Sequence, residues 1–172
     1  MNFAKGINGA QLSGILNVSR NLSGLQASSI LNQAKTAHGA QVTAILNNAD
    51  SLKGAQISGA FNRARIIRGT QITSLLNYAN ELNGVQIGVV NIANRGRATQ
   101  IGLININRSG VHNLEIYATE TFLTNIAYRG GSKHFHSILV GGFDPSTFGN
   151  KFLYTYGFGV GTTFGNRPKL YY

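Results

Sequence analysis

Residues 54–68 read Gly-Ala-Gln-Ile-Ser-Gly-Ala-Phe-Asn-Arg-Ala-Arg-Ile-Ile-Arg, and variants of this stretch precede and follow it along the chain. Each copy starts with a glycine, carries a glutamine two residues later and has an asparagine further on. The glycines recur every fifteen residues, at Gly9, Gly24, Gly39, Gly54, Gly69 and Gly84. A unit of this length cannot enclose a hydrophobic core alone, so successive units must stack on one another.

The length of the unit also restricts its secondary structure. Helical repeats built from two packed helices have periods above about 30 residues, which excludes them here. A single helix per unit, with the glycine in the connection, remains an alternative. Two short strands with their turns fit better, because a strand rises about 3.3 Å per residue. We therefore predict an all-β chain in which residues 1–110 form a β-solenoid of about seven rungs, each of about fifteen residues.

The repeated amides are the predicted structural residues of this solenoid. In stacked rungs about 4.8 Å apart, identical amide side chains lie above one another and can form hydrogen-bonded ladders. Each amide then donates to one neighbour and accepts from the other, which removes the cost of burying it. The predicted ladder residues are Gln11, Gln26, Gln41, Gln56, Gln71, Gln86 and Gln100, with Asn17, Asn32, Asn47, Asn62, Asn77, Asn91 and Asn105.

Other positions of the repeat predict how each rung is wound. Glycine at the start of a rung favours a corner with positive φ. We predict that four sets of residues point inward. One set is the residue after each glutamine, and another is the pair before each asparagine. The other two are the small residue two positions after the asparagine and the apolar residue five positions after the asparagine. Charge gathers at an outward corner three residues after the asparagine, at Arg20, Lys35, Asp50 and Arg65.

The distance from glutamine to asparagine changes along the chain. It is six residues in the first five copies and five in Gln86–Asn91 and Gln100–Asn105. Because side chains alternate along a strand, a spacing of six cannot place both amides on one face of an unbroken strand. We therefore predict a β-bulge near Ser13-Gly14 and Ser58-Gly59, and expect the last two rungs to be the most regular.

After Gly110 the repeat stops, and residues 111–172 are predicted to form an antiparallel meander. Residues 152–164 alternate between an aromatic and a glycine-rich face, over a length typical of a strand that crosses a bilayer. We expect either an incomplete outer-membrane barrel or a sheet that caps the solenoid. The other predicted strands are residues 114–118, 121–129, 134–143 and a last one from Lys169, with turns at 130–133 and 144–150.

The late repeats carry a resemblance to known families. Gln86-x-Gly88-x-x-Asn91-x-Ala93 and Gln100-x-Gly102-x-x-Asn105 resemble a bacterial surface-repeat family built on Gly-x-Gln-x-Gly-Leu-x-Asn units, and the curlin motif of bacterial amyloid fibres. This resemblance covers roughly residues 6–110, and the segment after it is similar to the strands of outer-membrane β-barrels attached to such repeats. It implies a protein exposed at the bacterial surface or in the outer membrane, in contact with membrane lipid.

The charge balance suggests anionic partners. The chain has 15 Lys and Arg against 5 Asp and Glu, a formal charge of +10. Such an excess favours anionic glycans, lipid headgroups or, less favoured here, nucleic acid. A solvated edge that prevents association is the alternative. The candidate anion-binding residues are Lys35, Lys53, Arg63, Arg65 and Arg68.

Residues that could support catalysis are few. The chain has no cysteine, which excludes thiol nucleophiles and zinc–thiolate sites. His134 and His136 could share a strand face but lack a neighbouring acid to complete a metal site, and Glu115 and Glu120 have no evident common geometry. We therefore predict no enzymatic activity, no cofactor and no small-molecule substrate.

The predicted function is that of a bacterial surface or outer-membrane protein with a structural or adhesive role. The alternatives are a self-assembling fibre subunit, and a soluble solenoid that binds an anionic polymer or ice. Residues 1–9 lack the basic and apolar regions of a signal peptide, and we expect the chain to be a fragment of a longer exported protein.

Overall fold

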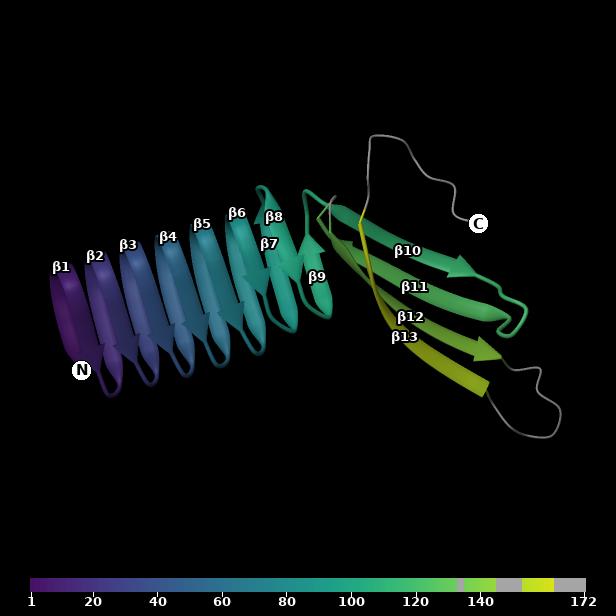
Figure 1. The fold of residues 1–172 in the computed structure, drawn as a ribbon, viewed down its shortest axis with the longest axis horizontal. Coiled ribbons are helices and arrows are strands. Elements are labelled where there is room, and N and C mark those ends of the chain that lie inside the picture. Colours follow the sequence, from purple (N-terminus) through teal and green to yellow (C-terminus); the bar gives the residue numbers. More distant parts are fainter. Residues whose placement is uncertain (133–134, 145–152, 163–172) are drawn as a thin grey trace.

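A computed structural model describes residues 1–132, 135–144 and 153–162, and these residues form an all-β fold without helices (Figure 1). The prediction of a β-solenoid followed by an antiparallel sheet is confirmed. Nine strands form the solenoid: β1 (Asn2–Ser13), β2 (Leu16–Ser28), β3 (Leu31–Thr43), β4 (Leu46–Ser58), β5 (Phe61–Thr73), β6 (Leu76–Ile87), β7 (Val90–Arg95), β8 (Ala98–Ile101) and β9 (Ile104–Asn107). Four strands form the second sheet: β10 (Val111–Tyr117), β11 (Thr124–Gly131), β12 (His136–Asp144) and β13 (Leu153–Gly161).

The solenoid strands pair in parallel and the register matches equivalent repeat positions. From β1 to β7 each strand pairs with the next along the chain, after which β8 pairs with β6 and β9 with β7. Gln26 pairs with Gln41, Asn32 with Asn47, and Gly39 with Gly54. The residues at the position of Lys5, Arg20 and Lys35 are not paired, whereas the residues directly before and after them are. Each long strand therefore bends there, as expected of the charged outward corner.

The repeated glycines form a second corner, and their positive φ angles confirm the prediction. These angles rise from 118° at Gly9 to 153° at Gly84. Close approach of neighbouring rungs adds a further requirement, because a Cβ built on Gly54 would lie 2.0 Å from the carbonyl oxygen of Gly39. Glycine is the residue that satisfies both conditions.

The predicted bulge near Ser13-Gly14 and Ser58-Gly59 is wrong. The parallel register runs without interruption to Ser13 and Ser58, and the chain then turns through a two-residue corner, such as Gly14-Ile15, into the next strand. The glutamine and the asparagine thus lie on different strands that face each other across the coil. A spacing of six residues spans the corner and needs no extra residue within a strand.

The expectation that the last rungs are the most regular is also wrong. They are interrupted at Gly96 and divided into the short strands β7, β8 and β9. The strand before each two-residue corner ends one residue earlier, at Ile87 or Ile101, and lacks the buried hydroxyl position that Ser58 and Thr73 occupy in earlier rungs. Backbones approach closely at these corners, since a Cβ on Gly102 would lie 1.8 Å from the Gly88 carbonyl oxygen.

The interior contains only part of the predicted inward set. The small residues two after each asparagine and the apolar residues five after it are buried, and the two sets form one core cluster that includes Ala49, Leu52, Ala64 and Ile67. The residue after each glutamine points outward, as does the first of the two before each asparagine, so the prediction for these positions is wrong. Leu12 is 62% exposed, and Ile15 is also exposed.

The second sheet has the order β10-β11-β12-β13 and is antiparallel throughout. Its strands overlap the predicted ones, but Gly130 and Gly131 belong to β11, and the turn closes where the Ser132 amide donates to the Phe135 carbonyl. Strand β11 packs on β9, since a Cβ on Gly130 would lie 2.3 Å from the Asn105 carbonyl oxygen. The sheet therefore covers the C-terminal end of the solenoid. The predicted turn at 144–150, apart from Asp144, and the strand from Lys169 lie outside the described residues.

Candidate functional site

The seven glutamines form one column inside the solenoid. Gln26 Nε2 donates to Gln11 Oε1 over 2.8 Å, and the same 2.8 Å bond joins each later glutamine to the one in the preceding rung. The side chains from Gln26 to Gln100 have no exposed surface. The column is therefore a continuous chain of amide hydrogen bonds along the solenoid axis, as the sequence predicts.

The seven asparagines form a second column on the facing strands. Asn17 Nδ2 donates to Asn32 Oδ1 over 3.0 Å, and the following links measure 2.9–3.0 Å. The asparagines from Asn17 to Asn91 also reach across the coil, as when Asn47 Nδ2 donates to the Ile57 carbonyl over 2.7 Å. The asparagines therefore connect successive rungs and also tie together the two halves of one rung.

The two columns have opposite polarity, which the sequence does not indicate. Each glutamine donates toward the N-terminal end of the solenoid, whereas each asparagine donates toward the C-terminal end. At the β1 end, the glutamine column ends on the Nε2 donor of Gln11. The asparagine column ends there on an acceptor, since Asn17 Oδ1 is buried without a hydrogen bond among the described residues.

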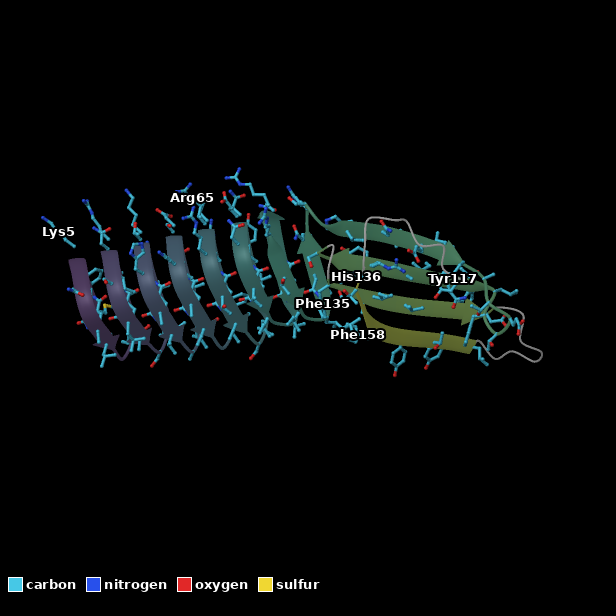
Figure 2. The ribbon with its side chains drawn as sticks, turned by 45° about the horizontal axis from the view of Figure 1, so that its top comes forward. Lys5, Arg65, Tyr117, Phe135, His136 and Phe158 are labelled. Carbon is cyan, nitrogen blue, oxygen red and sulfur yellow. The ribbon has the colours of Figure 1, made fainter. Side chains whose placement is uncertain are left out.

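The candidate cations do not form one site. Lys35 and Arg65 lie on the edge that bends at the charged corner, where Asp50 separates them. Figure 2 shows Lys5 and Arg65 on this same edge. Lys53 pairs with Arg68 in a neighbouring column, and Arg63 lies in a third column, beside Phe61 and Tyr78 in a hollow of about 390 Å³. All five candidate side chains are exposed.

Apolar side chains that were expected in the core instead form an exposed apolar edge along the two-residue corners of the solenoid. The corners lie on the lower side of the solenoid in Figure 1. Its exposed side chains come from the residue after each glutamine and from the corner itself. They are Leu12, Ile15, Ile30, Val42, Ile45, Ile57, Ile72, Leu75, Ile87, Val89, Ile101 and Leu103.

The second sheet has two chemically different faces. The register aligns Ile116, Ile126, Gly141 and Tyr156 across all four strands on one side, which we call the apolar face. Tyr156 is 86% exposed and Ile116 is 71% exposed. The remaining exposed large side chains of this face are Leu114, Phe143, Tyr154, Phe158 and Val160. Alternation along β13 predicts this face, but only the pairing shows that it extends over every strand.

The opposite side, the glycine face, carries polar groups. Arg129 contacts Glu115 at 3.5 Å. Gly142 leaves room for Asn125 and Gly161 for His136, because a Cβ at either position would lie about 2.5 Å or less from these side chains. Asn125 donates through Nδ2 to the Tyr117 and Phe122 carbonyls. The glycines thus accommodate buried polar side chains.

The acids and histidines that the sequence singles out do not come together among the described residues. Glu115 pairs with Arg129 and not with Glu120, which is exposed in a bend. His134 lies outside the described residues, and no group of three His, Cys, Asp or Glu within the described ranges could hold a metal ion. In the same part of the chain, no helix has the length and hydropathy needed to cross a membrane.

Comparisons of the chain with protein-family models, curated proteins and solved structures find no match.

Proposed function

We propose that this chain is a non-enzymatic structural or adhesive repeat protein of the bacterial surface, held at the outer membrane by its second sheet. The apolar face supports the proposal, because eight large apolar side chains are exposed on one side of a four-stranded sheet. Water-soluble proteins rarely leave so large a contiguous apolar patch uncovered.

The contrast between the two faces is a second argument. Strands that contact lipid on one side and a polar interior on the other alternate between apolar and polar or small residues. Strands β12 and β13 each have nine described residues, close to the 9–11 that a tilted membrane strand needs. The Arg129–Glu115 pair and the buried Asn125 lie on the side away from the apolar face. The solenoid projects from this sheet with its amides buried, which suits a rigid stalk or spacer.

Lipid contact is testable with vesicles. The 172-residue chain is expected to float with zwitterionic phosphatidylcholine vesicles at about 0.15 M salt, where headgroups without net charge attract a cationic protein little. Replacing both Tyr156 and Phe158 by lysine should reduce the bound fraction at least tenfold, since a lysine facing lipid costs about 2–4 kcal/mol at the bilayer centre.

The matched control is Thr155→Lys, which adds a lysine to the glycine face of the same strand. It should bind vesicles as the unchanged chain does. Equal flotation of the Tyr156→Lys, Phe158→Lys variant and the unchanged chain, with both folded by circular dichroism, would refute lipid binding through the apolar face.

A further inference from the structure

One narrow side of the solenoid carries most of the charge of the early rungs. On each rung it runs from the charged corner to the residue before the corner glycine, as in residues 50–53 and 65–68. Asp50 is the one acid in residues 1–80. The exposed cations of this side on β1–β5, which we call the basic strip, are Lys5, Arg20, Lys35, Lys53, Arg65 and Arg68. They do not converge on one point but follow the solenoid axis, and Figure 2 shows Lys5 and Arg65 on the same edge.

The cations of the basic strip are available to a partner. None of them forms an ion pair among the described residues, whereas Arg95 on a later rung contacts Glu81 at 3.3 Å. The opposite edge of the coil, the apolar edge, consists of uncharged side chains. Six cations against one acid on a single side create a positive potential that attracts polyanions.

We propose that the basic strip binds a linear acidic polysaccharide laid along the solenoid axis. This inference rests on the proposed adhesive role and names the class of partner for it. Each of the strands β1–β5 supplies at least one cation to the strip, so positive charges recur at the strand spacing, about 4.8 Å. A pyranose unit has a similar length, so a polysaccharide with one carboxylate per sugar places about one carboxylate at each rung.

The residues between the cations suit sugar hydroxyls better than nucleic-acid bases. The exposed or half-buried polar residues of this side are Asn8, Asn21, Ser23, Thr36, His38 and Ser51. Their amide, hydroxyl and imidazole groups can donate hydrogen bonds to sugar hydroxyls and accept hydrogen bonds from them. The segments of this side, residues 5–8, 20–23, 35–38, 50–53 and 65–68, include no Phe, Tyr or Trp on which unpaired bases could stack. Duplex DNA carries one charge per about 1.7 Å of its axis, a density that one cation per rung does not match.

The test measures the binding of polygalacturonate, a linear polysaccharide with one carboxylate per sugar, by isothermal titration calorimetry at about 0.05 M salt. The chain is expected to bind polygalacturonate and not dextran, which carries no charge. Binding should weaken as salt rises to about 0.15 M, because exposed charges are screened. Replacing both Arg65 and Arg68 by glutamine should reduce the affinity at least tenfold, since two charges of the strip are lost.

The matched control is the Arg63→Gln, Arg108→Gln variant. It loses the same net charge, but both arginines are exposed outside the strip, so it should bind polygalacturonate as the unchanged chain does. Absence of binding, or an equal loss of affinity in both folded variants, would overturn the proposal. Tighter binding of duplex DNA than of polygalacturonate, lost in the Arg65→Gln, Arg68→Gln variant, would assign the strip to nucleic acid and also overturn it. These titrations contain no lipid, so their failure would leave lipid binding by the second sheet unaffected.

Discussion

Replacing Gly54 by alanine is expected to destabilise the solenoid by at least about 3 kcal/mol, which corresponds to a fall of roughly 10 °C in melting temperature for a chain of this size. Gly54 has a φ of 138°, which side chains rarely adopt, and the added Cβ would lie 2.0 Å from the Gly39 carbonyl oxygen. The contact is between backbones of adjacent rungs, so no side-chain rotation can relieve it. Urea and thermal unfolding followed by circular dichroism measure the loss.

Replacing two further glycines by alanine distinguishes the cost of the backbone conformation from the cost of the contact between rungs. Gly9 has positive φ, but a Cβ there meets no atom within 4 Å, so Gly9→Ala reports the cost of the backbone conformation alone, about 1–2 kcal/mol. Gly14 has neither constraint, and Gly14→Ala should change stability by less than about 1 kcal/mol. If the three variants were equally stable, the close approach of the rungs at the glycine corner would be contradicted.

Replacing Asn62 by leucine is expected to cost about 3–5 kcal/mol. Asn62 Nδ2 donates to Asn77 Oδ1 over 3.0 Å and to the Ile72 carbonyl over 2.7 Å, while its Oδ1 accepts from Asn47 over 3.0 Å. Leucine has a similar size but leaves these buried groups without their partner, at about 1–3 kcal/mol each. Urea unfolding gives the free energy.

Arg63→Ala is the control for Asn62→Leu, because Arg63 is the next residue and its side chain is exposed. Its effect should be within about 0.5 kcal/mol. Equal melting temperatures for the two variants would contradict the contribution of the asparagine column to stability.

Periodicity predicts the architecture because a fifteen-residue period leaves few alternatives. It gives the parallel stacking, the alignment of Gln26 with Gln41 and the glycine corner, since each depends only on equivalent residues lying above one another. The all-β class and the sheet after Gly110 follow from strand-like alternation. These features need no knowledge of how a single rung is wound.

The path of one rung could not be predicted in the same way. Hydrophobic residues such as Ile57 and Ile45 were expected inside, but the interior is filled by amides and by residues such as Ala49 and Leu52. The direction of a side chain depends on where the corners fall, and a period does not locate them. The bulge predicted at Ser58-Gly59 was wrong for the same reason, because the chain turns a corner there.

The candidate sites depended on similar information. A cluster of arginines close in sequence suggested one anion site, yet Arg63, Arg65 and Arg68 belong to separate columns, because Arg65 occupies the charged corner and the other two lie on either side of it. The polarity of the amide columns depends on which atom of each carboxamide faces which neighbour. Residue identity alone cannot supply that choice.

The uniform link between rungs makes the solenoid a molecular ruler. Asn47 donates to Asn62 as Asn32 donates to Asn47. Because these links are equivalent, an interior repeat can be duplicated or deleted and the flanking repeats still form the same hydrogen bonds. Each added copy lengthens the rod by one strand spacing, about 4.8 Å, and leaves both extremities unchanged. The length of the solenoid can therefore change in fixed steps with the number of repeats, without new packing contacts at either end.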